Sequence, residues 1–154
     1  MKGRKAGWAR QMRGHGVVAE RAGASLLDLE GGFAGEAVDR VRAGWPYKSL
    51  REVAEAYHLD LRAVAGILRI PERTLARRRH SGRFLADESD RLARLARVGA
   101  LAQSILGDRE KTSRWLTTGN PALGGRPPLD LLDTDPGCRQ VEGVLQRISH
   151  GIVS

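Results

Sequence analysis

The chain has 154 residues, of which 41% are apolar, and a formal net charge of +8. This apolar content excludes a wholly disordered protein, while no apolar run approaches the roughly 18 residues that a membrane span needs. The basic N-terminus is not followed by an apolar run, so no secretory signal is predicted. The single cysteine, Cys138, excludes an intramolecular disulfide and a cysteine-rich zinc site and favours a cytoplasmic protein.

The positive charge is concentrated in the first half of the chain. Residues 1–13 have five basic side chains and no acidic one, and residues 69–83 have six arginines against one glutamate. Residues 107–154 have six basic and six acidic side chains and are therefore neutral. We expect only the first half to meet a polyanion such as nucleic acid.

Helical periodicity runs through the chain, and no segment alternates like a half-buried strand, so the predicted fold is all-α. Residues 1–33 are rich in glycine and basic side chains and are predicted as an arm, which either follows a DNA groove or is a solubilising tail. The first firm helix is predicted over 35–43, with Val38 and Val41 facing inward and Gly44 at its end.

Two short helices are predicted next. Ser49 and Glu52 have the spacing of a capping box, and the helix that they start has one apolar face. That face consists of Leu50, Val53, Ala54 and Tyr57. Asp60 is placed to cap the following helix, which turns Leu61, Val64, Ala65 and Leu68 inward.

Four further helices are predicted in the rest of the chain besides a short basic helix over 72–80. The longest spans 87–106, ends at Gly107, and has Leu92, Leu95, Val98, Leu101, Ala102 and Ile105 on its apolar face. Asp108 is placed to cap a helix that carries Trp115 and Leu116, a loop follows over 119–125, and Pro128 starts a short helix through Leu132. The last helix is predicted over 137–149, with Val141, Val144, Leu145 and Ile148 inward.

The helices over 61–68 and 72–80 have the lengths and the tight connection of a helix-turn-helix. The second is the predicted recognition helix, because its arginines suit both guanine edges and phosphates. Leu75 faces the core with Ile70, which turns Arg73 and Arg77 toward DNA, and Arg78 or Arg79 toward phosphate. The predicted DNA-binding residues are Arg69, Arg73, Thr74, Arg77, Arg78 and Arg79. The alternative to DNA binding is that these arginines form a solvated charged face on an ordinary helix hairpin. One residue departs from the usual helix-turn-helix pattern: Arg69 stands where such turns usually have glycine.

The second half resembles the Xre/MbcA/ParS-type antitoxins of type II toxin–antitoxin systems. The likeness covers about residues 36–154 and is most specific in the NPALGG stretch over 120–125, which follows the Trp115-Leu116 pair. Residues 128–132 and 141–151, with Ile70, Thr74-Leu75 and 87–92 upstream, extend it. The sequence departs from the family at Gly119, where proline is favoured, and at Pro127, where threonine or serine is common.

The chain is therefore predicted to have three parts: a basic, glycine-rich arm (1–33), a helix-turn-helix domain (34–84) and, as the resemblance implies, a helical toxin-binding and dimerisation domain (85–154). The resemblance implies an antitoxin that covers the active site of a cognate NAD-consuming toxin, of RES-domain type or an ADP-ribosylating relative, and that represses its own operon. The partners would be this toxin and operator DNA, with a homodimer inside a hetero-oligomeric complex on the bacterial nucleoid and no membrane. The implied toxin-binding residues are Trp115, Asn120, Arg147, His150, Gly151, Ile152 and Val153.

Several alternatives stay open at this point. Trp115 is either a core anchor or a toxin contact, the chain end either blocks the toxin or frays, and the long apolar face over 92–106 is either intramolecular core or a dimer seam. Gly99 within that face either admits another helix or is simply tolerated. A stand-alone transcription regulator and a pure interaction protein with a degraded helix-turn-helix are the rival functions.

No catalytic constellation stands out in the sequence. The four histidines are scattered without metal-ligand spacing, Cys138 has no histidine nearby, and neither Gly31-Gly32 nor Gly124-Gly125 is followed by a phosphate-loop signature. We therefore expect no enzyme activity, no cofactor and no metal.

Overall fold

The computed structural model describes residues 34–152. Within this range the chain is helical, apart from one isolated antiparallel bridge between Pro46 and Arg83, which confirms the all-α prediction. The elements are α2 (Ala34–Ala43), α3 (Lys48–Ala56), α4 (Leu61–Ile67), α5 (Glu72–Ser81), α6 (Ala86–Leu106), α7 (Arg109–Thr117), the 3-10 helices η3 (Pro121–Leu123) and η4 (Pro128–Leu131), and α8 (Asp135–Ser149). The predicted arm and Val153 lie outside the described residues.

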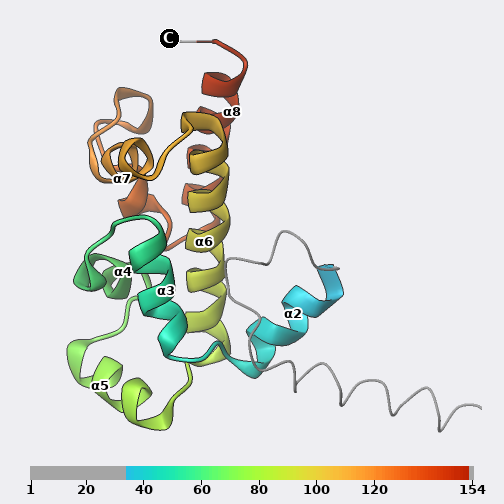
Figure 1. Cartoon of the computed structure of the whole chain (residues 1–154), viewed down its shortest axis with the longest axis vertical. Helices are drawn as coiled ribbons and strands as arrows, with labels where there is room; N and C mark the ends of the chain where they lie inside the picture. Colours follow the sequence, from blue (N-terminus) through green and yellow to red (C-terminus); the bar gives the residue numbers. More distant parts are fainter. Residues whose placement is uncertain (1–33, 153–154) are drawn as a thin grey trace, which may run out of the picture.

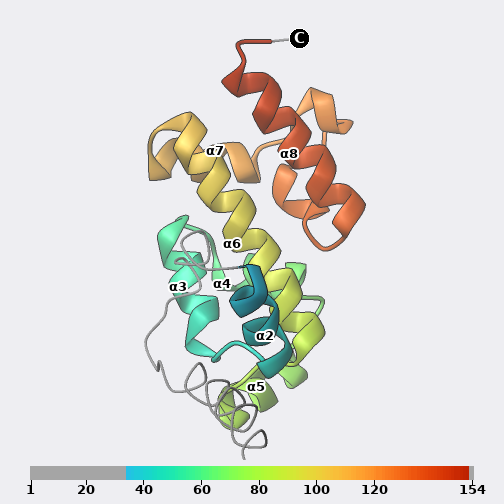
Figure 2. The ribbon, with the colours of Figure 1, turned by 90° about the vertical axis from the view of Figure 1, so that its right-hand side faces the viewer.

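The long helix α6 is the central element of the fold. It contacts α2, α3 and α4 in the first half of the chain and α7 and α8 in the second. Figures 1 and 2 show these two groups of helices at the two ends of α6, with α5 near its start and the C-terminus at the opposite end. One continuous hydrophobic core therefore joins both halves.

The apolar face predicted for α6 is used within the chain. Four of its residues are fully buried: Leu92, Leu95, Val98 and Ala102. Two more, Leu101 and Ile105, are partly buried against the same core. These residues recur at helical spacing, so a single face meets helices from both halves. The same side chains are thus core residues of one chain.

Gly99 marks a close approach of the Tyr57 ring to α6. A Cβ atom at this position would lie 2.5 Å from Cε2 of Tyr57, which is shorter than any ordinary contact. The Tyr57 hydroxyl donates a hydrogen bond of 2.9 Å to the Ala96 carbonyl oxygen on the same helix. The partner that Gly99 admits is therefore the ring of Tyr57, which follows α3 in the same chain.

Several helix ends follow the sequence prediction. Gly44 and Gly107 end α2 and α6 in the left-handed conformation, with φ of 83° and 91°. The Asp108 carboxylate caps α7 by accepting a hydrogen bond of 2.7 Å from the Lys111 N–H. The last helix begins at Asp135, two residues before the predicted start, because Thr134 caps it through the Gly137 N–H.

The predicted start of α3 is wrong. Ser49 lies inside the helix and is buried, and Tyr47 occupies the N-cap position without a side-chain hydrogen bond, so Ser49 and Glu52 form no capping box. The tight turn around Pro46 starts this helix earlier, since the Ser49 and Leu50 N–H groups bond the carbonyls of Pro46 and Tyr47.

Two inward-facing predictions in α2 and α4 are also wrong. Val38 is 47% exposed and Leu61 is 41% exposed, whereas Val41 is partly buried and Val64 is buried. Asp60 takes the N-cap position of α4 in extended conformation, but its side chain makes no capping hydrogen bond. The periodicity identified both helices correctly, yet Val38 in the middle of α2 and Leu61 at the start of α4 remain exposed.

Candidate functional site

The first candidate surface is the pair α4 and α5, joined by the turn over 68–71. Arg69 takes the left-handed conformation there, with φ of 53°, at the position where such turns usually have glycine. Ile70 after the turn is buried, and Leu75 of α5 packs against the core. The two helices and the turn thus have the expected helix-turn-helix arrangement, built with a non-glycine residue in the strained position.

Helix α5 buries none of its residues and exposes a row of arginines. Arg73, Arg77 and Arg79 are exposed, and within the described range none of them forms an ion pair. Thr74 beside them is half-buried. These guanidinium groups are therefore available to a polyanion, as the periodicity predicted.

Arg78 has a different environment from its neighbours. Its Nε lies 2.8 Å from Oε2 of Glu88 and its Nη2 lies 3.0 Å from Oε1, while the two side chains are only 11% and 7% exposed. The hydrogen bond to Glu88 raises the pKa of Arg78. Glu88 also accepts a hydrogen bond from the Leu85 N–H, so this forked pair fixes α5 on the first turn of α6.

Arg69 is bound to the second half of the chain. Its Nε donates to Oδ2 of Asp133 at 2.7 Å, across the boundary between the helix-turn-helix and the C-terminal helices. The Arg91 guanidinium donates to the Leu68 carbonyl at 3.0 Å, so the turn is held from a second side. Arg69 therefore has an intramolecular partner. Because the two residues are 64 positions apart, the sequence alone did not predict this ion pair.

The second candidate surface begins at the loop after α7. Asn120 caps η3 through a hydrogen bond of 3.0 Å from the Ala122 N–H to its Oδ1, and its carbonyl accepts from the Gly125 N–H. A Cβ on Gly119 would lie 2.5 Å from the Gly125 carbonyl oxygen, so glycine is needed for this close approach. Asn120 thus holds the shape of the loop, while Trp115 packs half-buried against the core beside fully buried Leu116.

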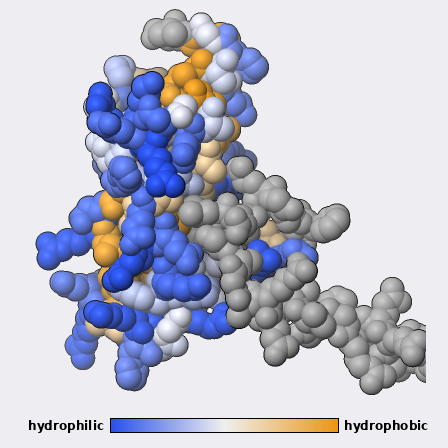
Figure 3. All heavy atoms as spheres, in the orientation of Figure 1, coloured by the Kyte–Doolittle hydropathy of each residue, from blue (hydrophilic) through white to orange (hydrophobic). Residues whose placement is uncertain are grey.

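The end of α8 is exposed. Arg147 and His150 lie on its last turns, and Gly151 ends it in the left-handed conformation with φ of 70°. The Ile152 N–H bonds the Arg147 carbonyl at 2.9 Å, yet its side chain is 59% exposed. Figure 3 shows hydrophobic atoms at this end of the molecule, next to the C-terminus.

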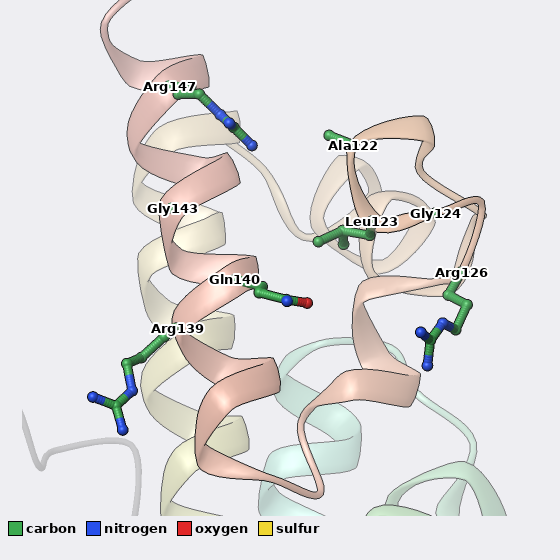
Figure 4. Close-up of a pocket in the computed structure, with 8 residues that line it drawn as sticks. All are labelled: Ala122, Leu123, Gly124, Arg126, Arg139, Gln140, Gly143 and Arg147. Carbon is green, nitrogen blue, oxygen red and sulfur yellow. The ribbon is translucent and has the colours of Figure 1, made fainter.

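A cleft of about 490 Å³ lies between this helix and the loop that precedes it. Arg126 of the loop and Gln140, Gly143 and Arg147 of α8 are among its lining residues, and no acidic side chain is. Figure 4 shows Gln140 and Arg147 projecting from α8 toward the loop, whereas Arg139 points away. Both Arg126 and Arg147 line this cleft, although Figure 4 shows the Arg126 side chain on the outer side of the loop, well apart from that of Arg147. Of the two, only Arg147 was expected from the sequence to bind toxin.

Other chemistry is sparse in the described range. Residues 34–152 contain no cluster of histidine, cysteine and acidic side chains that could hold a metal ion, and no helix long and apolar enough to cross a membrane. Burial raises the pKa of the Cys138 thiol, whose Sγ lies 3.8 Å from the Leu132 carbonyl oxygen. This cysteine is therefore a core residue in its protonated form.

Comparison with known proteins identifies both domains. Residues 36–97 match the antitoxin Xre-like helix-turn-helix domain, and residues 101–151 match the antitoxin Xre/MbcA/ParS C-terminal toxin-binding domain. A protein of Yersinia enterocolitica named Antitoxin Xre is 34% identical over 90% of this chain and 87% of its own length. The chain belongs to the Xre family of type II antitoxins.

Two further relatives have different names. An Antitoxin Xre of Photorhabdus laumondii is 39% identical over 62% of this chain and 64% of its own length. A protein of a Sphingobium species named Prs ADP-ribosylating antitoxin is 28% identical over 74% of this chain and 80% of its own length. As a family member the chain is a DNA-binding antitoxin, with its helix-turn-helix domain on α2–α6 and its toxin-binding domain from the end of α6 through α8.

Proposed function

We propose that this antitoxin neutralises a cognate NAD-consuming toxin by covering the toxin's active site with its C-terminal domain, and that it represses its own operon through the helix-turn-helix. The observation that supports it best is the arrangement along α6. The unpaired arginines of α5 lie near one end of this helix, and the exposed end of α8 lies at the other.

For operator binding, Arg73 and Arg77 are the proposed base-reading side chains and Arg79 the proposed phosphate contact. All three are exposed on the helix that a helix-turn-helix places in the major groove. Thr74 is proposed to lie beside them at the groove. Arg78 and Arg69 are proposed to position this surface, because Glu88 and Asp133 hold their guanidinium groups.

For neutralisation, we assign the blocking role to Arg147, His150, Gly151, Ile152 and Val153. The described members of this set are exposed, and the Ile152 side chain is not used by the fold. Trp115 and Asn120 support this end from within the domain, through the core and through the loop over 119–126.

The proposed toxin chemistry is NAD consumption of the RES-domain type. The relative named Prs ADP-ribosylating antitoxin favours a second candidate, a toxin that transfers ADP-ribose to a protein. Both chemistries use NAD, so they differ in the fate of the ADP-ribose. We also propose a homodimer on the operator, since helix-turn-helix proteins read paired half-sites.

The test is co-expression of the full chain with the product of the adjacent gene, following host growth, cellular NAD and ADP-ribosylated protein. We expect the neighbour alone to stop growth and the full chain to restore it. Truncation of residues 147–154 should abolish rescue while leaving operator binding unchanged. Loss of cellular NAD without ADP-ribosylated protein indicates a toxin of the RES type. The appearance of ADP-ribosylated protein indicates a toxin of the ADP-ribosylating type. A harmless neighbour would favour the stand-alone regulator instead.

A further inference from the structure

The cleft between α8 and the loop over 119–126 has an unbalanced charge. Arg126 and Arg147 form no ion pair within residues 34–152, and no lining residue is acidic. Arg139, the third arginine there, pairs with Asp135 on its own helix. Glu142, which precedes Gly143 on α8, pairs with Arg97 of α6. Two guanidinium groups in one concave surface therefore lack an anionic partner.

The helix wall of the cleft contains a glycine that the fold does not require. Gly143 lies in the interior of α8, where glycine is less favourable than alanine. A Cβ atom there would meet nothing within 4 Å, in contrast to Gly99 and Gly137, where it would collide with neighbouring atoms. Intramolecular packing thus gives no reason for glycine at this position. Its effect is to keep the cleft open between Gln140 and Arg147, so that another backbone can approach the helix.

We propose that this cleft receives an acidic segment of the toxin, whose carboxylates pair with Arg126 and Arg147 while its backbone passes over Gly143. Arginine suits such a partner because its planar fork binds a carboxylate with two hydrogen bonds. The cleft lies wholly inside the matched toxin-binding domain of residues 101–151, which favours the toxin over other polyanions as occupant. The proposal rests on the proposed function, and it adds a docking site that shares Arg147 with the blocking residues at the chain end.

The test uses the full chain and the purified product of the adjacent gene, with dissociation constants from titration calorimetry and thermal unfolding of every variant. The first variant combines Arg126→Glu and Arg147→Glu, with the double change Arg51→Glu and Arg62→Glu on exposed positions of α3 and α4 as the charge-matched control. The second variant is Gly143→Leu, which fills the cleft. Its control is Gly66→Leu, because a Cβ at Gly66 of α4 also meets nothing within 4 Å.

We expect the Arg126 and Arg147 reversal to weaken toxin binding by about 100-fold or more, since reversal turns attraction into repulsion. Gly143→Leu should weaken it by about tenfold while the melting temperature stays the same or rises, which a loss of fold would not do. Both controls should bind like the wild type. Binding of the Arg126 and Arg147 reversal should be restored in part by a toxin with the matching acidic residue changed to lysine, whereas binding of Gly143→Leu should not.

Wild-type affinity of Gly143→Leu and of the double arginine reversal would overturn the proposed cleft while leaving the antitoxin function intact. Failure of the unchanged chain to bind or neutralise the neighbour would instead overturn the proposed function. If the cleft variants lose binding of operator DNA and keep binding of the toxin, the occupant is nucleic acid and the proposal is wrong.

Discussion

Replacing Gly99 by alanine is expected to destabilise the protein, although the same change stabilises most helix interiors. The new methyl group would lie 2.5 Å from Cε2 and 2.6 Å from Cζ of Tyr57. Because Tyr57 is only 3% exposed and its ring is enclosed by the core, the ring must move against packed neighbours. Such overpacking costs about 1–3 kcal/mol.

Two smaller effects act on the same variant in opposite directions. A displaced ring weakens the hydrogen bond from the Tyr57 hydroxyl to the Ala96 carbonyl, worth about 0.5–1.5 kcal/mol. Alanine in place of glycine favours the helix by about 1 kcal/mol. These two effects nearly cancel, so the net loss should stay near 1–3 kcal/mol, a fall of about 2–12 °C in melting temperature for a chain of this size.

The assay is thermal and urea unfolding of Gly99→Ala beside a matched Gly143→Ala and a Tyr57→Phe variant. Gly143→Ala should gain about 0.5–1 kcal/mol, because its methyl group meets open space. Tyr57→Phe should lose only the hydrogen bond, about 1 kcal/mol. If Gly99→Ala instead rises in stability like Gly143→Ala, the close approach of the Tyr57 ring to α6 is refuted.

Three further predictions concern the DNA-binding half and the core. Arg73→Ala and Arg77→Ala should each weaken operator binding by about 1–3 kcal/mol in a mobility-shift titration without changing toxin neutralisation; unchanged operator affinity would exclude α5 as the recognition helix. Arg69→Gly should be about 1 kcal/mol more stable than Arg69→Ala in urea unfolding. Both variants lose the ion pair with Asp133, but the φ of 53° at this position is strained for alanine and not for glycine. Burial raises the pKa of Cys138 above its ordinary 9.0, so the folded protein keeps a proton that the unfolded chain releases as pH rises. Stability relative to Cys138→Ala should therefore be constant below about pH 9 and fall above it, as urea midpoints at several pH values would measure.

The sequence predicted the helices well because their positions depend on local patterns. The apolar spacing of Leu92, Leu95 and Val98 places α6, and the left-handed glycines 44 and 107 end α2 and α6 as expected. The capping box predicted at Ser49 is wrong because the S-x-x-E spacing is only a weak signal. The turn at Pro46 determines where α3 begins. Local signals therefore give the elements, and where two local signals compete the edge of a helix shifts by a residue or two.

The candidate surfaces were less predictable, because partners far apart in sequence decide which arginine is free. Arg77, Arg78 and Arg79 are adjacent in the chain, yet among the residues that the structure describes only Arg78 meets a carboxylate, that of Glu88. Gly99 and Gly143 are likewise both glycines in helix interiors, and only the fold distinguishes the one that accommodates a tyrosine from the one that faces a cleft. Periodicity gives the face on which a residue lies, but it does not give what lies opposite.

The geometry of α6 bears on how the two activities are combined. Its 21 residues give a helix about 30 Å long. The recognition helix α5 is fixed at its start by the Arg78–Glu88 pair, and the end of α8 lies beyond its other end. A toxin that binds at the chain end, as proposed, does not need the proposed DNA-binding arginines of α5, so on this proposal the two partners do not compete for the same residues. On the same proposal, an effect of the toxin on operator binding passes through the contacts that join the halves, and the pair of Arg69 with Asp133 is among those that reach the turn itself.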